Sequence, residues 1–224
     1  MRKALLLIAA AVALGVLIAL TTVAARSGGD GSYAFLHHQP GDPSTPVTFS
    51  SCKPVRVEIN LDGVRRPELV KRMVLSAMGE VSAASGLQLQ YVGPTTRRPV
   101  WRDPTLTVEG GAWPVLVAFA TPAELPEMRW ALGRGGGTPY PVGDVYAFVT
   151  GVVVLETDYF NGLPGRYRGV EHGRATVMHE LGHLLGLDHV RDGGELMNEK
   201  GHGTTELGPG DRRGLALLGK GPCT

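Results

Sequence analysis

One stretch of this sequence decides how the rest is interpreted: His179-Glu180-Leu181-Gly182-His183-Leu184-Leu185-Gly186-Leu187-Asp188-His189. Side chains four residues apart lie on one face of a helix, so His179 and His183 can present imidazole nitrogens to a single metal ion. Gly186 has no Cβ atom and can adopt the left-handed conformation that ends a helix sharply. The chain can then turn and bring His189 to the same ion. The pattern therefore predicts a metal site held by His179, His183 and His189.

The residue after the first of these histidines has a different role. Glu180 follows His179 directly, which places its carboxylate beside the ion and not on it. That position suits a general base that takes a proton from metal-activated water. Three imidazoles leave one position of a tetrahedral zinc ion open, as in catalytic sites, whereas structural sites are closed by four protein ligands. We therefore expect Zn²⁺ as the cofactor and Glu180 as the catalytic residue.

The chain before this stretch alternates between strand and helix patterns. Residues 55–61 alternate apolar and polar side chains, as half-buried strands do, and residues 87–91 repeat that pattern. Between them, Pro67 to Ser85 has apolar residues at helical spacing. A strand-helix-strand run of this kind predicts two parallel strands joined by a right-handed crossover. Val115 to Ala120 is continuously apolar, which predicts a central strand covered on both faces.

Glycine dominates the region that follows. The segment from Gly133 to Gly143 contains three consecutive glycines and two prolines, and we predict a loop there. Two strands are expected at Val145 to Val149 and at Val152 to Leu155, with a tight hairpin at Gly151 that makes one of them antiparallel.

Two further helices complete the predicted fold, at Arg174 to Leu187 and at Gly210 to Leu218. The fold class is α/β (α+β), with a mixed, mostly parallel sheet, one antiparallel edge strand and three helices.

The N-terminal part of the chain differs from the rest. Arg2 and Lys3 precede an uncharged run from Ala4 to Ala25, so residues 1–25 are predicted to be a signal peptide or an N-terminal membrane anchor. Either interpretation places the rest of the chain outside the cytoplasm, secreted or membrane-anchored. Residues 26–51 are rich in glycine and proline and are expected to form a flexible tether. The folded domain is predicted to span residues 52–224.

Two cysteines stand at the ends of that domain. The termini of a domain often lie close together, and export supplies an oxidising compartment, so we predict a disulfide between Cys52 and Cys223. The alternative is a Cys52 thiolate that caps the metal and keeps the site latent.

Charge excludes some partners. The sequence has 22 Lys and Arg against 21 Asp and Glu, so no overall field attracts nucleic acid. We expect a monomer whose partners are peptide or protein substrates, with membrane contact only through an uncleaved N-terminal segment.

The histidine stretch has the form His-Glu-x-x-His-x-x-Gly-x-x-His and so resembles the metzincin zinc metallopeptidases. Met197 follows His189 by eight residues and is similar to the methionine turn beneath the zinc of that family. This short spacing, together with the segment 207–219, resembles the matrixin branch. The resemblance covers residues 52–224 and implies a zincin-like fold, with Asp211 either bonding the backbone of the methionine turn or simply favouring the start of the last helix. Glu199 stands where related branches carry an additional tyrosine ligand.

The resemblance also makes structural Ca²⁺ possible in the region of Gly133 to Gly143. The nearby carboxylates are those of Asp144, Glu156 and Asp158, but their spacing assigns no ligands.

Together these features predict a zinc-dependent endopeptidase acting outside the cytoplasm. We expect the substrate to lie extended along an edge strand, Val145 to Val149. Two alternatives remain open: a catalytically silent, zinc-stabilised extracytoplasmic binding module, and a metal-dependent hydrolase of non-peptide substrates.

Overall fold

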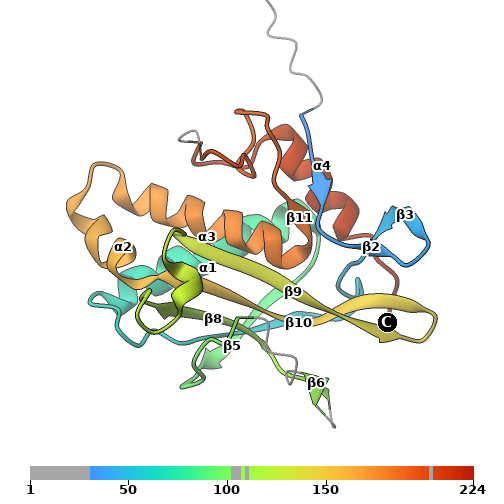
Figure 1. Cartoon of the computed structure of the whole chain (residues 1–224), viewed down its shortest axis with the longest axis horizontal. Coiled ribbons are helices and arrows are strands. Elements are labelled where there is room, and N and C mark those ends of the chain that lie inside the picture. Colours follow the sequence, from blue (N-terminus) through green and yellow to red (C-terminus); the bar gives the residue numbers. More distant parts are fainter. Residues whose placement is uncertain (1–30, 102–106, 109–110, 202–203) are drawn as a thin grey trace, which may run out of the picture.

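The computed structural model describes residues 31–101, 107–108, 111–201 and 204–224. Its centre is a five-stranded sheet in the order β5-β4-β8-β10-β9 (Figure 1). Strands β5, β4, β8 and β10 run parallel, and β9 pairs antiparallel with β10 at the edge. The mixed, mostly parallel sheet with one antiparallel edge strand is therefore confirmed. The strands of this sheet are β4 (Val55–Ile59), β5 (Leu89–Pro94), β8 (Val115–Ala120), β9 (Gly133–Val142) and β10 (Val145–Glu156).

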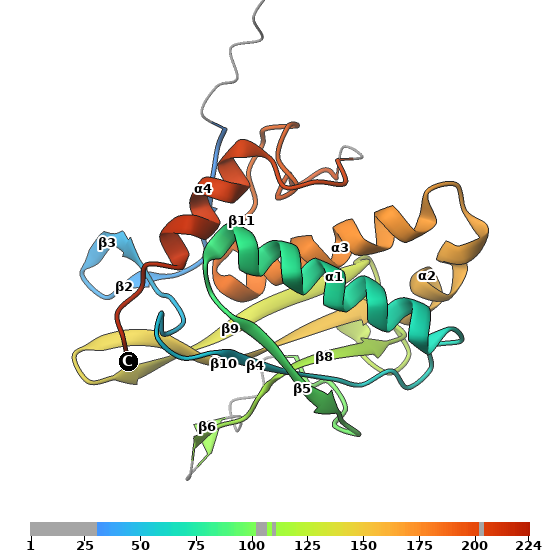
Figure 2. The same cartoon turned by 180° about the vertical axis from the view of Figure 1, so that it is seen from behind.

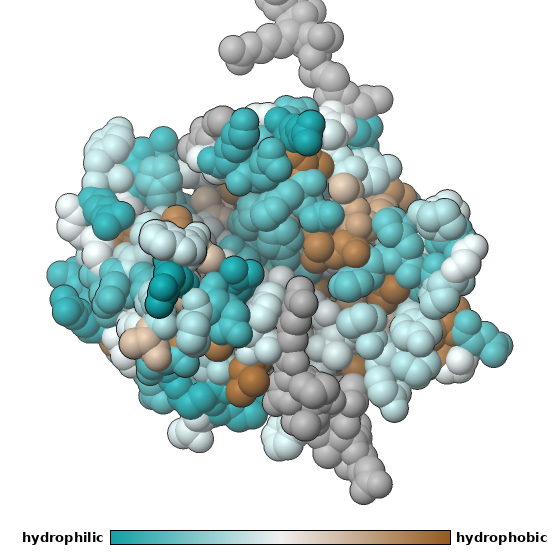
Figure 3. All heavy atoms as spheres, viewed as in Figure 1, coloured by the Kyte–Doolittle hydropathy of each residue, from teal (hydrophilic) through white to brown (hydrophobic). Residues whose placement is uncertain are grey.

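Two long helices cover one face of this sheet. Figures 1 and 2 show α1 (Pro67–Ser85) and α3 (Gly169–Leu185) side by side on it, with α4 (Pro209–Leu218) at one end of the pair. The buried residues of α1 recur every three or four positions, so one stripe of the helix faces the core. Gly86 ends the helix with a left-handed φ of 79°. The space-filling view shows that the exposed surface on the side of Figure 1 is mostly hydrophilic, with apolar residues in small separate patches (Figure 3).

The described part of the chain has four α-helices where the sequence predicted three. The additional one is α2 (Thr157–Gly162), a helix of 6 residues directly after β10. Glu156 caps it, because its carboxylate accepts the backbone N–H groups of Asp158 and Tyr159. Helix α3 also begins earlier than predicted, at Gly169. Such a short helix has too few turns to show an apolar period, and its cap is the main local signal for it.

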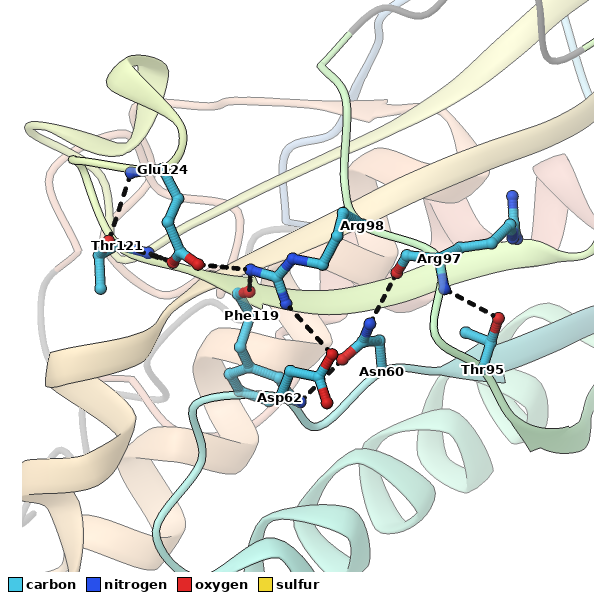
Figure 4. Close-up of polar contacts among 8 residues, drawn as sticks. All are labelled: Asn60, Asp62, Thr95, Arg97, Arg98, Phe119, Thr121 and Glu124. Carbon is cyan, nitrogen blue, oxygen red and sulfur yellow. Dashed lines mark hydrogen bonds and ion pairs between the residues drawn. The ribbon is translucent and has the colours of Figure 1, made fainter.

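The opposite face of the sheet is crossed by the connection between β5 and β8. Figure 4 shows Arg97 and Arg98 of this connection extending over the strands. The Arg97 carbonyl accepts a hydrogen bond from Asn60, and Arg98 bonds the Phe119 carbonyl and the Glu124 carboxylate. These contacts fix the connection against the ends of β4 and β8. A second, smaller core forms on this face from Leu116, Ala118, Ala120, Leu125, Met128, Val152 and Val154. A separate two-stranded pair, β6 (Thr107–Val108) and β7 (Gly111–Ala112), belongs to the same connection.

The glycine-rich segment was predicted to be a loop, and this prediction is wrong: it forms the edge strand β9. The turn lies instead at Gly143, with a φ of 60°, and β10 continues without interruption through Gly151. A Cβ atom on Gly135 would lie 1.9 Å from the Glu180 carbonyl oxygen, and one on Gly137 would lie 2.8 Å from the Leu184 carbonyl oxygen. Glycine is needed here because the backbone of α3 packs directly on β9, and not because the chain turns.

The same arrangement changes the predicted substrate strand. Val145 to Val149 is the first part of β10 and not an edge, because β9 pairs on one side of it. On its other side, Phe148 N–H bonds the Thr48 carbonyl at 2.8 Å, and the Gln39 side chain bonds both backbone groups of Tyr146. The exposed edge next to the helix that carries the histidines is therefore that of β9.

Residues 31–51 were predicted to be part of a flexible tether, but the structure packs them against the domain. Strand β1 (Ala34–Phe35) pairs antiparallel with β11 (Leu187–Asp188), and β2 (His38–Gln39) forms a hairpin with β3 (Asp42–Pro46). Val47 and Phe49 are buried in the main core. The partners of this segment are far away in the chain, from 107 residues for Gln39 and Tyr146 to 182 residues for Gly31 and Arg213. Its proline and glycine content was therefore a poor guide.

The predicted signal peptide or anchor, residues 1–25, lies outside the described residues, as do tether residues 26–30. Among the residues that the structure does describe, no helix is long and apolar enough to cross a membrane.

Cys52 and Cys223 form the predicted disulfide, with Cα atoms 5.3 Å apart and a sequence separation of 171. The bond excludes the alternative in which a Cys52 thiolate caps the metal site.

We expect the replacement of both cysteines by serine to lower the free energy of unfolding by about 2–5 kcal/mol, because the link restricts a very long loop in the unfolded chain. Urea denaturation of the wild type and of the Cys52→Ser, Cys223→Ser variant, each with and without reductant, measures this. Reductant should destabilise only the wild type; equal midpoints for all four samples would contradict the expected contribution.

Candidate metal centre

The second half of α3 and the turn after it position the predicted ligands. His179, Glu180 and His183 lie on α3, which ends at Gly186 with a left-handed φ of 118°. The Gly186 N–H bonds the carbonyls of Gly182 and His183, which satisfies two of the unpaired carbonyls at the helix end. The chain then reverses into β11 and delivers His189. Strand β1 pairs with β11 and so holds this turn from outside.

The three histidines converge on one point. The Nε2 atom of His189 lies 3.0 Å from Nε2 of His179 and 3.1 Å from Nε2 of His183. Nitrogen ligands of a tetrahedral zinc ion, at bond lengths of about 2.0–2.1 Å, stand about 3.3 Å apart. Among the described residues, this is the one group of three or more histidine, cysteine or acidic side chains close enough to hold a metal ion together.

The positions of the protons on these imidazole rings are also those expected at a metal site. Nδ1 of His179 lies 2.8 Å from the Leu196 carbonyl oxygen, and Nδ1 of His183 lies 2.8 Å from the Leu187 carbonyl oxygen. A carbonyl oxygen only accepts, so both Nδ1 atoms carry the proton of the neutral ring and both Nε2 atoms present lone pairs. His189 Nε2 carries at most one proton and cannot bond both of them. A cation between the three nitrogens resolves this conflict, and such Nδ1 contacts are typical of metal-binding histidines.

Burial favours the neutral, ligating form of the two helix histidines. It lowers the pKa of His179 to about 4, helped by the charge of His189 and opposed by the bond to Leu196. It lowers the pKa of His183 to about 3, where the charge of His179 adds to the effect. Both rings are therefore available as ligands at neutral pH, since protons do not compete for them.

Glu180 lies beneath the start of β9. A Cβ atom on Gly133 would lie 2.7 Å from its Oε1 atom, so the strand passes directly over the carboxylate. Burial raises the pKa of Glu180 to about 8; the charge of Arg134 and a hydrogen bond from the Gly135 backbone oppose this rise. The side chain is only 6% exposed. A carboxyl group in such a place is held close to the pH at which a general acid and base operates.

This burial predicts a pH dependence of stability in the metal-free protein. Between its ordinary pKa of 4.5 and about 8, the folded state keeps a proton on Glu180 that the unfolded state has lost, so Glu180 costs stability as the pH rises. Glu180→Gln does not titrate, and its stability relative to the wild type should increase by on the order of 2 kcal/mol from pH 5 to pH 8. Urea midpoints of both proteins with chelator at the two pH values test this, and the histidine contributions cancel in the comparison. A difference that does not change with pH would mean that Glu180 ionises normally.

The predicted methionine turn lies under the histidines. The Met197 side chain is buried, and a Cβ atom on Gly182 of α3 would lie 2.7 Å from its sulfur. Both roles considered for Asp211 are present. Its carboxylate accepts the N–H groups of Leu196 and Met197 in the turn and that of Gly208 before α4.

Glu195 completes this arrangement and was not singled out from the sequence. It accepts the N–H groups of Gly210 and Asp211, while Asp211 accepts those of the turn, so the two buried carboxylates fix each other's backbone. The Leu196 carbonyl that receives His179 Nδ1 is thereby held in place. Burial raises the pKa of Asp211, and the neighbouring charge of Glu195 adds to the rise. No local pattern distinguishes Glu195 from a solvated loop acid.

A cleft of 740 Å³ opens over the site between β9, α3 and the segment after the methionine turn. It is lined by all three histidines and Glu180. His172 also lines this cleft without joining the three. The exposed side of the cleft carries Trp130, whose side chain is 93% exposed. Arg134, on β9, is a second residue of the cleft that the sequence did not identify.

The carboxylates considered for calcium do not gather into a group of metal-binding side chains in the described residues, so nothing in the structure supports calcium. Glu156 caps α2, and no group of three or more such side chains includes Glu156, Asp144 or Asp158. His38 is exposed on β2, and His202 lies outside the described residues.

Comparisons with known proteins complete the description of the site. No protein-family model matches this sequence, and no curated protein matches it. Among solved structures, this chain is similar to archaemetzincin from Methanopyrus kandleri, with a TM-score of 0.44 and 19% sequence identity over 73% of this chain and 92% of that chain. The chemistry of the site therefore rests on its own geometry.

Proposed function

We propose that this protein is a zinc-dependent endopeptidase. The observation that carries the proposal is the convergence of three histidine Nε2 atoms whose protons are directed elsewhere, next to a buried carboxylate at the edge of a strand. His179, His183 and His189 would hold the ion. Zinc, when bound there, supplies Lewis-acid polarisation of the scissile carbonyl and of the attacking water.

Glu180 does the proton transfer in this proposal. Its carboxylate takes the proton of the attacking water as general base, and the resulting carboxylic acid gives that proton to the leaving amine. Burial helps both steps, since it favours the protonated form that must exist between them. The Gly135 N–H orients the carboxylate from β9.

The substrate would add to the edge of β9. This strand ends the five-stranded sheet, so its outer backbone groups have no partner strand within it. An extended peptide paired there passes over Glu180 and the histidines, because β9 itself lies directly on that part of α3. Main-chain hydrogen bonds give such binding affinity for peptides of varied sequence.

The two alternative functions, a zinc-stabilised binding module and a hydrolase of non-peptide substrates, differ in whether they need Glu180. A zinc-stabilised binding module without turnover has no use for a buried carboxylate beside the ion, because burying it costs free energy. A hydrolase of non-peptide substrates would use the same histidines and the same carboxylate, but it needs no strand edge. The exposed edge of β9 therefore favours a peptide.

We also propose that the protein acts outside the cytoplasm, either secreted or held by residues 1–25 as an anchor. The disulfide between Cys52 and Cys223 supports this location, since such links persist in oxidising compartments.

The deciding experiment incubates the zinc-loaded full chain with a peptide library and with small ester and amide substrates that lack a peptide backbone. Mass spectrometry identifies new termini, and elemental analysis gives the zinc content. Internal cleavage of peptides alone supports the proposal. Cleavage of the small substrates alone supports the non-peptide hydrolase, and zinc binding without any turnover supports the binding module.

A further inference from the structure

One arginine of the cleft is fixed in position but forms no ion pair within the described part of the chain. Arg134 lies on β9, and its Nε atom donates to the Glu127 carbonyl at 2.7 Å. Its guanidinium carbon lies 5.7 Å from the centre of the Trp101 ring, a cation–π contact. These two contacts fix the position of the guanidinium, and Arg134 is one of the residues that line the cleft over the histidines.

The other nitrogens of this side chain are unused. Within the described part of the chain, no carboxylate lies within 4 Å of the Arg134 guanidinium, and its two Nη atoms have no acceptor. By contrast, Arg97, Arg98 and Arg174 each pair with at least one carboxylate. Arg134 is half-buried, so its free N–H groups are only partly hydrated. A planar guanidinium with free, partly hydrated N–H groups suits a carboxylate, because it can donate two parallel hydrogen bonds to the two carboxylate oxygens.

Successive side chains of β9 point to opposite sides of the strand, and this determines which part of a bound peptide would reach Arg134. Gly133 and Gly135 face α3, since Cβ atoms there would collide with Glu180. Arg134, between them, points to the other side of the strand. Side chains at paired positions of neighbouring strands point to the same side. A peptide on the outer edge of β9 would therefore place alternate side chains over the histidines and beside Arg134.

We propose that Arg134 is a specificity-determining residue that binds the carboxylate of an aspartate or glutamate side chain in the peptide substrate, close to the cleaved bond. The proposal rests on the proposed peptidase function for the register of the peptide. It extends that function by naming the class of substrate, peptides with an acidic residue near the cleavage site.

Binding to a variant that cannot turn over separates this inference from catalysis. The full chain carrying Glu180→Gln is loaded with zinc and tested against a positional-scanning peptide library. Each position in turn carries Glu or Gln, and all C-termini are amidated so that only side chains supply a carboxylate. We expect Glu to bind about tenfold more tightly than Gln at one position, as a charge-assisted pair does. With Arg134→Gln added, this ratio should fall to about one, and Arg134→Lys should retain part of it, because the charge remains without the planar fork.

Lys200 provides the matched control, because it is a second cation that lines the same cleft. Lys200→Gln should leave the Glu preference at that position in place, and circular dichroism with zinc analysis shows that each variant is folded and loaded. A Glu-to-Gln ratio near one at every position, or a ratio that survives Arg134→Gln, would overturn the proposal. If the preference depends on Arg134 but the wild type cleaves no member of the library, carboxylate recognition stands and the peptidase function fails.

Discussion

Glu180→Gln is expected to remove peptide hydrolysis and to leave zinc bound. The amide is nearly the same size as the carboxylate, but it cannot accept a proton from water. Loss of a general base costs about 10²–10⁴-fold in rate. Glu180 is not one of the three converging ligands, so the variant should retain about one zinc ion per chain. The measurements are kcat/KM on a cleaved peptide and elemental analysis of the same sample.

Glu199→Gln is the control for this prediction. Glu199 also lines the cleft, but it is exposed and follows the methionine turn. Its replacement should change kcat/KM far less than Glu180→Gln does. Undiminished hydrolysis by Glu180→Gln would exclude this residue as the base, and a loss of zinc along with activity would show that the substitution acted on the metal instead.

The second large effect is expected from the ligands themselves. In a His183→Ala, His189→Ala double variant only His179 remains of the three rings. One imidazole alone does not hold zinc tightly, and no other side chain of the described residues joins this group. Zinc content should fall from about one ion per chain to near zero after dialysis, and hydrolysis should be lost with it. Elemental analysis, together with the shift of the thermal unfolding midpoint on addition of zinc, measures this, because a metal that binds only the folded state stabilises it.

His172→Ala separates a ligand effect from a general effect of removing histidine from the cleft. His172 lines the same cleft and lies two turns earlier on α3, outside the converging group. This variant should keep both its zinc and the zinc-dependent shift in unfolding midpoint. Full zinc retention in the double variant would mean that the metal is held elsewhere.

Local patterns were sufficient wherever one element decides the outcome. The apolar spacing from Pro67 predicted α1 to its last residue, and the continuous apolar run predicted β8 with both ends correct. The spacing of His179 and His183, with the helix end at Gly186, predicted that the histidines come together, because helix geometry alone brings residues four apart to one face.

The failures share a different cause. The glycines of β9 suggested a loop, although they are needed where the backbone of α3 touches the strand. Residues 31–51 suggested a tether, although β1 is held by β11 and Phe49 lies in the core. In each case the deciding partner is distant in the chain, and composition within a window carries no information about it.

By itself, then, the sequence determined the set of side chains that can hold a metal ion, the carboxylate beside them, the order of most strands and helices, and the pairing of Cys52 with Cys223. Only the tertiary structure decided that β9 is the exposed edge over Glu180 and that Glu195 and Asp211 fix the turn under His179. It also decided that Arg134 forms no ion pair within the described part of the chain. The physical reason is the distance along the chain between the residues that interact. Helix spacing and capping depend on residues a few positions apart, whereas close packing of a helix on a strand and the burial of charge depend on where the whole chain passes.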